Sequence, residues 1–160
     1  MTDAVDALAE QETALVLDSF DHDDAWLLGS RVRERAAAAA LGVAIDIRRP
    51  SGAVLFHAAL PGATADNDRW IERKSAVVFR FECSSALVAA RLGAAGVDAE
   101  DLAWLDATAY AVTGGSLPIR VRGAGIVAAL TVSGLSSDDD HALAATCVAQ
   151  LRDERRSARA

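Results

Sequence analysis

Two short stretches of the chain place a histidine among carboxylates, a combination that can bind a metal ion or transfer a proton. One of them, D-H-D-D, spans residues 21–24, and the other, D-D-D-H, spans residues 138–141. Neutral imidazole is a ligand for iron and zinc, and its pKa near neutrality suits general acid and base catalysis. His22 and His141 are therefore candidate haem or metal ligands. Carboxylates also stabilise the first turn of a helix, so each stretch could instead simply begin one.

The second stretch has the richer context. A sharp S-G-L turn at residues 133–135 precedes it and can bring the start of the following helix beside a glycine loop at residues 114–115. An imidazole partly buried beside carboxylates has a raised pKa and can titrate near neutrality. His141 is therefore the candidate catalytic acid or base, with a hydrogen-bonded structural histidine as the alternative, and we expect His22 to mark a helix start. The three histidines form no H-x-x-x-H or H-E-x-x-H pair, so their spacing indicates no metal site.

Lys74 is the single lysine of this acidic chain and follows Trp70 by four residues, which places the two on one face of an expected helix. Together with Arg73, it could receive a carboxylate of a ligand, such as a propionate, or an aspartate such as Asp139 from another element. The alternative is an exposed salt bridge with the acidic residues 68 and 72 of the same helix. Both interpretations stay open at the level of sequence.

Two polar segments allow a functional and a structural interpretation. The segment G-G-S-L-P-I at residues 114–119 could present N–H groups to an anion, although it lacks the nucleotide forms G-x-G-x-x-G and G-K-[ST]. A tight loop entering a strand explains the same residues. Ser84 and Ser85 lack the G-x-S-x-G elbow of a nucleophile, so we expect one of them to cap a helix. The complete candidate ligand-binding set is Asn67, Trp70, Arg73, Lys74, Ser84, Gly114, Gly115, Ser116, Asp140 and His141.

Apolar periodicity and chain-breaking residues predict the order helix, hairpin, helices, strands, helix. A helix that begins at Asp18 or Asp21 should end at Gly42, before a β-hairpin with strands 43–47 and 53–59. Two clusters of antiparallel strands separated by helices predict an α+β fold. The other expected elements are helices at 65–81 and 84–93, a short helix near 100–105, strands after Gly114 and at 125–133, and a helix from Ser136 or Ser137.

Composition narrows the class of protein. With 160 residues, 52% hydrophobic and 24% charged, the chain is typical of one globular domain, residues 1–160, with a helical arm at 1–16 and a polar tail at 153–160. Its net charge of -7 argues against nucleic acid as a partner. No apolar run approaches the ~20 residues that span a bilayer, and the start carries no signal-peptide pattern. Cys83 and Cys147 show no paired spacing, so we expect a cytoplasmic protein with no membrane partner.

Four motifs follow one another along nearly the whole chain after its first dozen residues. They are D-N-x-x-W-x-x-R-K at 66–74, S-S at 84–85, G-G-S-x-P-I at 114–119, and T-V-S-G-L at 131–135 followed by D-D-H at 139–141. Together they resemble the haem-degrading-domain, or GlcG/HbpS-like, superfamily, and more narrowly its small branch of unknown function. The resemblance implies a profilin-like α+β fold, with helices on both faces of an antiparallel sheet of about five strands. It also implies homo-oligomers, as rings or stacked dimers, and haem or a related tetrapyrrole as the cofactor.

Three functions remain open at this point. The first is an oligomeric binding or assembly protein that holds a small anionic ligand, such as haem, between Lys74, the glycine loop and His141. The second is an enzyme that degrades haem or processes a small acid with His141 as general acid or base, although no catalytic motif is present. The third is a structural or protein-interaction module in which the N-terminal segment and Trp26 pack between subunits. The fold signal is strong and each catalytic signal is weak, which favours the first.

Overall fold

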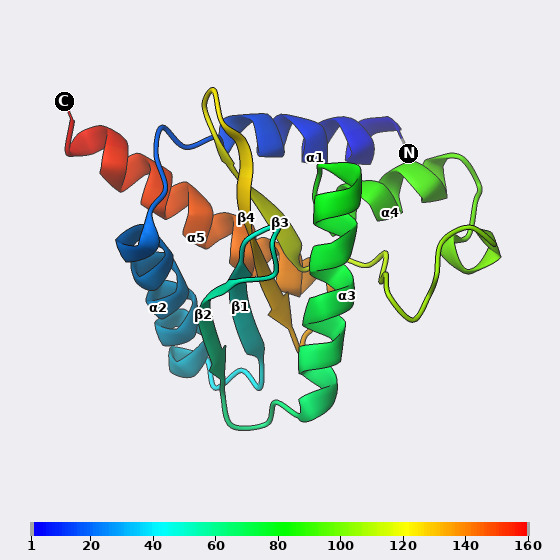
Figure 1. Ribbon diagram of the computed structural model, residues 1–160, viewed down its shortest axis with the longest axis horizontal. Coiled ribbons are helices and arrows are strands. Elements are labelled where there is room, and N and C mark those ends of the chain that lie inside the picture. The colour runs from blue at the N-terminus through cyan, green and yellow to red at the C-terminus, as the bar shows by residue number, and fades with distance from the viewer. Residues whose placement is uncertain (1, 160) are drawn as a thin grey trace.

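The computed structural model describes residues 2–159, which form helices around one small sheet (Figure 1). The α+β class predicted from the sequence is confirmed. In chain order the elements are α1 (Thr2–Ala14), α2 (His22–Ala38), β1 (Ala44–Arg48), β2 (Val54–Ala59), α3 (Ala65–Phe81), α4 (Ser85–Ala94), the 3-10 helix η1 (Ala99–Asp101), β3 (Ser116–Val121), β4 (Gly125–Ser133) and α5 (Ser137–Ser157).

The sheet has four strands in the order β2-β1-β4-β3, and all neighbours are antiparallel. The expectation of about five strands is therefore wrong by one. The nearest approach to a fifth strand is Leu17, which forms a single parallel bridge to Val121 at the β3 edge. Its N–H donates to the carbonyl of Arg120, and its own carbonyl accepts from Arg122. The pairing stops there because α2 begins a few residues later.

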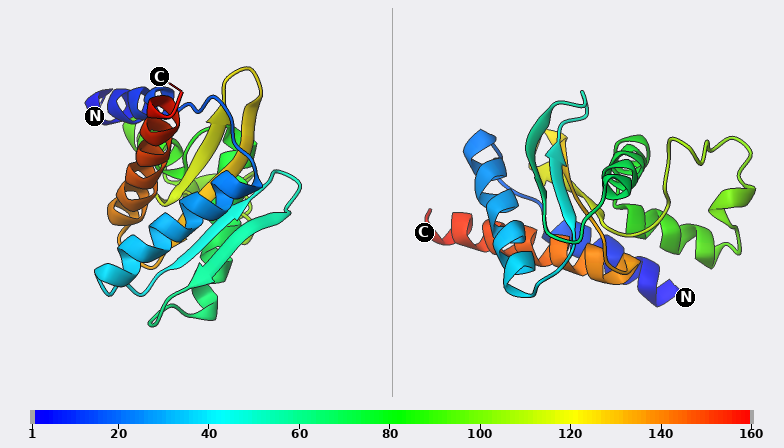
Figure 2. Two further views of the ribbon diagram at one scale, coloured as in Figure 1. Left: turned by 90° about the vertical axis from the view of Figure 1, so that its left-hand side faces the viewer. Right: turned by 90° about the horizontal axis from the view of Figure 1, so that it is seen from below.

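One face of the sheet is apolar and carries the main core. The side chains of Ile45, Ile47, Leu130 and Val132 share this face and are fully buried. Helices α2 and α5 cover it, and Figure 2 shows α2 and α3 on opposite sides of the sheet. Burying a side chain of this size stabilises the fold by roughly 1.5–3 kcal/mol. The predicted arrangement with helices on both faces is confirmed.

The opposite face of the sheet, which α3 covers, is polar. Asp46, Thr131 and Ser116 lie side by side in register across three strands, and all three are fully buried. The Thr131 and Ser116 hydroxyl oxygens are 2.8 Å apart, and Asp46 accepts two hydrogen bonds from Arg48, at 2.6 and 2.9 Å. Buried polar groups are tolerated only when they are paired, so this layer is fixed in its geometry.

Helix α2 ends before the glycine that was expected to end it. Ala40, with φ 51°, takes the left-handed position, and Leu41 N–H donates to the carbonyl of Ala36 while Ala40 N–H donates to that of Ala37. These two bonds define a Schellman motif with alanine where glycine is usual. Gly42 serves packing instead, because a Cβ there would lie 3.1 Å from the backbone of Gly62.

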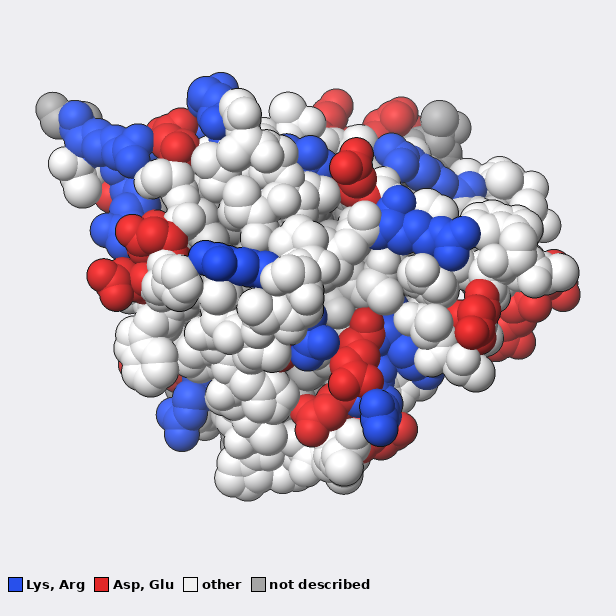
Figure 3. All heavy atoms as spheres, in the orientation of Figure 1, with Lys and Arg blue, Asp and Glu red and all other residues white. Residues whose placement is uncertain are grey.

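The two ends of the chain are helical and lie on the outside. Helix α1 packs against α4 through Val5, Leu8 and Ala9, and α5 continues as an exposed helix through residues 153–157. On the face shown in Figure 3, acidic and basic side chains are mixed, and basic ones gather at the C-terminal end of α5 in the upper left. Among residues 2–159, no helix has the length and apolarity that crossing a membrane requires.

Candidate functional site

A buried ion pair joins α3 to the start of α5. The Lys74 ammonium donates to Asp140 Oδ2 at 2.9 Å and to the carbonyl of Val132 at 3.2 Å. The side chains of Lys74 and Asp140 are only 5% and 2% exposed. The partner of Lys74 is therefore an aspartate from another element, as one interpretation of the sequence expected, but it is Asp140 rather than Asp139. The alternative of a pair on the same helix is wrong.

Local structure on each side holds the pair in place. Ser136 caps α5 by accepting a hydrogen bond from Asp139 N–H, and the free oxygen of Asp140 accepts from Leu135 N–H at 3.0 Å. The glycine loop makes room for the ammonium. A Cβ on Gly115, which has φ 122°, would lie 2.7 Å from Lys74 Nζ, and one on Gly114 would overlap the backbone of Ser137. Close approach thus requires glycine at both positions, and the positive φ of Gly115 requires it there as well.

An open pocket of about 300 Å³ lies over this pair. Its walls come from α3, from the end of β4 with the turn after it, and from the start of α5, which are brought together by the polar layer under α3. The lining residues are Asn67, Trp70, Lys74, Thr113, Ser133, Gly134, Leu135, Ser137 and Asp140. The structure therefore gathers four of the predicted site residues, Asn67, Trp70, Lys74 and Asp140, around one cavity.

The pocket is rich in hydrogen-bond donors. An ammonium group has three N–H donors, and two of those on Lys74 are used by Asp140 and Val132, which leaves one. The hydroxyl oxygens of Ser133 and Ser137 accept from Asn67 Nδ2 at 3.3 Å and from Gly114 N–H at 2.6 Å, so each keeps its own O–H to donate. This arrangement suits an oxygen-rich ligand, such as a carboxylate, better than a ligand that must donate.

His141 lies on another side of α5. Consecutive helical residues point about 100° apart, so Asp140 and His141 cannot both face this pocket. The imidazole is 6% exposed, and its Nε2 donates to Gln11 Oε1 of α1 at 2.7 Å. Burial lowers its pKa from the usual 6.5, with a smaller opposing contribution from Asp138. The expectation of a raised pKa beside the glycine loop is therefore wrong, because burial of the imidazole outweighs the effect of the Asp138 carboxylate.

The remaining candidates lie elsewhere. His22 is exposed at the first position of α2, where Asp21 and Asp24 form a capping box, so the interpretation of this stretch as a helix start is confirmed. Its Nε2 lies 3.3 Å from an Arg49 nitrogen. Ser84 caps α4 by accepting from Leu87 N–H, also as expected.

Arg73 and Ser116 lie near the pocket but do not line it. The Arg73 guanidinium carbon lies 4.6 Å from the centre of the Trp70 ring, and its buried Nε has no hydrogen-bond partner among residues 2–159. The Trp70 indole N–H donates to Asp66 at 3.0 Å. These contacts fix the ring in one orientation at the edge of the pocket. The Ser116 hydroxyl pairs with Thr131 inside the polar layer.

Sequence reasoning missed two groups of polar residues. Ser133 and Ser137 flank a turn and were considered only as part of that turn and as a helix cap. His57 has no acidic neighbour in the sequence, yet its two ring nitrogens lie 3.3 Å from Asp46 and 3.4 Å from Asp68. The period of two along β1 and β2 puts Asp46 and His57 on one face, which was the available signal.

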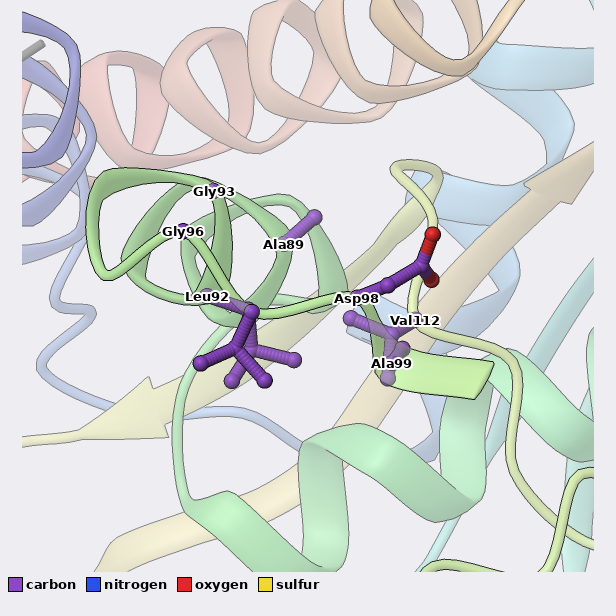
Figure 4. A pocket seen from close by; sticks show the side chains of 8 residues that line it. Ala89, Leu92, Gly93, Gly96, Asp98, Ala99 and Val112 are labelled. Atoms are coloured by element: carbon purple, nitrogen blue, oxygen red, sulfur yellow. The ribbon is translucent and has the colours of Figure 1, made fainter. Parts of the chain in front are cut away.

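A wider pocket of about 450 Å³ lies between α4 and the segment around η1, as Figure 4 shows. Its walls are small or apolar residues, among them Ala89, Leu92 and Val112. The one charged wall residue, Asp98, uses its carboxylate to accept from Glu100 N–H. This pocket offers little for polar recognition, so the Lys74 pocket is the better candidate site.

The fold and the pocket define a class: a small α+β protein with an antiparallel four-stranded sheet and a donor-lined cavity between α3 and α5. The chain belongs to the family described as haem degrading protein HbpS-like, which matches residues 20–149. It is 52% identical over 136 residues, 85% of each chain, to a UPF0303 protein of Streptomyces coelicolor. It is 43% identical to a UPF0303 protein of Acidobacterium capsulatum, over 90% of this chain and 87% of the relative.

Solved structures share the fold of this chain. The chain is similar to the Ybr137w protein with a TM-score of 0.87 and 32% identity, over 94% of this chain and 88% of that one. HbpS has a TM-score of 0.67 at 20% identity, over 82% and 89% of the two chains. A PduOC:heme complex has a TM-score of 0.69 at 18% identity, over 82% and 94%. The last two share the fold with this chain.

Proposed function

We propose that this protein binds a small carboxylate or a similar oxyanion in the Lys74 pocket. The proposal rests on the third N–H of the buried Lys74 ammonium, which neither Asp140 nor Val132 accepts. The hydroxyl groups of Ser133 and Ser137, which can also donate, line the same pocket. Asp140 already neutralises Lys74, so recognition rests on directed donors more than on net charge. Binding should therefore depend only weakly on ionic strength.

The size of the pocket limits the ligand. Small-molecule sites commonly enclose roughly 300–1,000 Å³, and this pocket lies at the lower end. A ligand of a few heavy atoms fits such a space better than a whole tetrapyrrole. His141 does not line the pocket, so the proposal includes no acid or base catalysis by that residue.

The single lysine allows a direct test. Protein labelled with ¹³C and ¹⁵N only at lysine has one labelled side chain, so its single Nζ signal is that of Lys74. Titration with acetate, succinate or inorganic phosphate should shift this signal with saturation. Ser133→Ala should weaken binding by about two- to tenfold, the effect of one lost hydrogen bond, while Ser51→Ala in the exposed hairpin turn should not. A Lys74 signal that no anion shifts would refute the proposal.

Haem is a second candidate ligand, favoured by a group of exposed side chains at the start of α2. His22 precedes Trp26 by one turn on the same face, Trp26 is 67% exposed, and Arg49 lies beside His22. An imidazole for iron, an indole for the ring and a guanidinium for a propionate are the contacts that haem requires. The description of the family supports this candidate.

The haem candidate has its own test. Haemin added to the purified protein should give a shifted Soret band, and His22→Ala should abolish the shift. His141→Ala is the matched variant, because His141 is covered by α1 and should contribute nothing unless α1 moves. A spectrum that neither substitution changes would exclude axial ligation by both residues.

We further propose that the protein works in the cytoplasm as a homo-oligomer. Both cysteines are free and buried, which supports a reducing compartment such as the cytoplasm. Trp26 and Val54 present exposed apolar surface near the β2 edge of the sheet, which supports an interface between copies of the chain. Sedimentation of the purified chain tests the assembly. Trp26→Glu should dissociate it, and an assembly that survives this change does not use that surface.

A further inference from the structure

A second cavity adjoins the Lys74 pocket on the other side of Trp70. It has a volume of about 240 Å³ and lies between α3 and the segment that carries η1. Trp70 and Thr113 line both cavities, so the two cavities are neighbours that share these side chains. The residues that line it are Trp70, Arg73, Asp98, Ala99, Glu100, Leu105, Ala107, Tyr110, Ala111, Val112 and Thr113.

Arginines fix the aromatic rings of this second cavity. Arg73 lies 4.6 Å from the centre of the Trp70 ring, and Arg80 lies 4.9 Å from the centre of the Tyr110 ring. A guanidinium held on an aromatic face limits the motion of that ring. The cavity therefore presents two oriented rings together with the apolar side chain of Leu105, which favours a flat apolar group between them.

The donors and charges of the two cavities set which end of a ligand enters which cavity. The carboxylates of Asp98 and Glu100 outnumber the Arg73 guanidinium among the side chains that line the second cavity, so this cavity favours an anion less. The Lys74 pocket instead offers N–H and O–H groups that can still donate to a ligand. The Arg73 Nε–H is buried without a partner among residues 2–159, so it can donate to a neutral acceptor on the flat group.

We infer that the physiological ligand is an aromatic or heteroaromatic carboxylic acid, with its acid group in the Lys74 pocket and its planar ring in the cavity of Trp70 and Tyr110. The inference rests on the proposed carboxylate site and adds the chemistry of the rest of the ligand. Each cavity is small enough for one group, an acid in the first and a ring in the second.

Matched pairs of acids test the ring subsite. Phenylacetate and 3-phenylpropionate are compared with cyclohexylacetate and 3-cyclohexylpropionate, which are similar in size but not planar, and with acetate. Binding is followed by the shift of the Trp70 indole N–H, one of three indole signals in the chain. The aromatic acids should bind about two- to tenfold more tightly than their saturated counterparts.

Variants then assign that preference to the cavity. Tyr110→Leu should abolish the preference while leaving acetate binding unchanged. Trp104→Leu is the control, because Trp104 also contacts Arg80, at 5.1 Å, but is 58% exposed and does not line the cavity. Ala107→Leu, at an exposed wall residue, should exclude the aromatic acids even if Tyr110→Leu proves unstable.

The outcomes separate this inference from the proposal that it extends. If acetate binds and the aromatic acids bind no more tightly than the saturated ones, the ring subsite is wrong and the carboxylate site stands. If the aromatic acids bind through Tyr110 but acetate does not perturb Lys74, the ring subsite stands and the acid site is wrong. If none of the acids binds, both are wrong.

Discussion

The two acidic helix starts of this protein look alike in sequence and differ in the structure. In each, one aspartate is buried and paired with a basic side chain from another helix: Asp24 with Arg155 and Asp140 with Lys74. Arg155 is 46% exposed, whereas Lys74 is 5% exposed and lines a pocket. A buried aspartate in the first helical turn thus forms a surface contact at α2 and part of a candidate binding site at α5. The burial of the basic partner, and not the run of acidic residues, distinguishes the two helix starts.

The largest effect should come from breaking the buried pair. Asp140→Ala leaves the Lys74 ammonium buried without a counter-charge, which should lower the free energy of unfolding by about 3–5 kcal/mol. Urea denaturation followed by circular dichroism measures this. The double variant Lys74→Met/Asp140→Leu removes both charges and should recover most of the loss. If the double variant is as unstable as Asp140→Ala, the cost does not arise from an unpaired charge.

The matching change at the other helix start should cost less. Asp24→Ala removes half of a capping box and the partner of a partly exposed arginine, for an expected loss of about 1–2 kcal/mol in the same denaturation experiment. High salt should reduce the loss of stability that Asp24→Ala causes, because Arg155 is accessible to solvent. A loss as large as that of Asp140→Ala would mean that the two helix starts are equivalent.

His141, in the second helix start, should make the stability of the fold depend on pH. The pKa of His141 is lowered by burial, so below its unfolded value of 6.5 the unfolded chain binds a proton that the folded chain does not. Stability from this group is complete above pH 6.5 and is lost as pH falls through that value towards the lower folded pKa. His141→Gln, which keeps a partner for Gln11, should remove this loss between pH 7.5 and 5.5.

Local elements could be predicted from the sequence, and contacts between layers could not. The Asp21 cap, the hairpin and the strand at Gly125–Ser133 depend on neighbouring residues and were found. The partner of Lys74 depends on how α3 and α5 pack across the sheet, which no local spacing encodes. Two nearby aspartates were equivalent in sequence, and the rotation of α5 selected Asp140.

The same rotation explains the misplacement of His141. The acidic run suggested an imidazole beside carboxylates and a glycine loop, but adjacent positions of a helix face different neighbours. Asp140 faces Lys74, and His141 faces Gln11 of α1. Helix α1 was expected only as an arm, so its role in covering His141 could not be anticipated. The fold class needed none of these contacts, which is why it was predicted correctly.

The smallest effect should come from His22→Ala. His22 is exposed at the first position of α2, and among residues 2–159 its one side-chain hydrogen-bond contact is that of 3.3 Å to Arg49, so the free energy of unfolding should change by less than about 0.5 kcal/mol. Denaturation at pH 7.5 and 5.5, run beside His141→Gln, measures this change at each pH. If His22→Ala removed the loss of stability at acid pH, the pH-sensitive group would lie at the first helix start and not at the second. The comparison between the two helix starts would then be reversed.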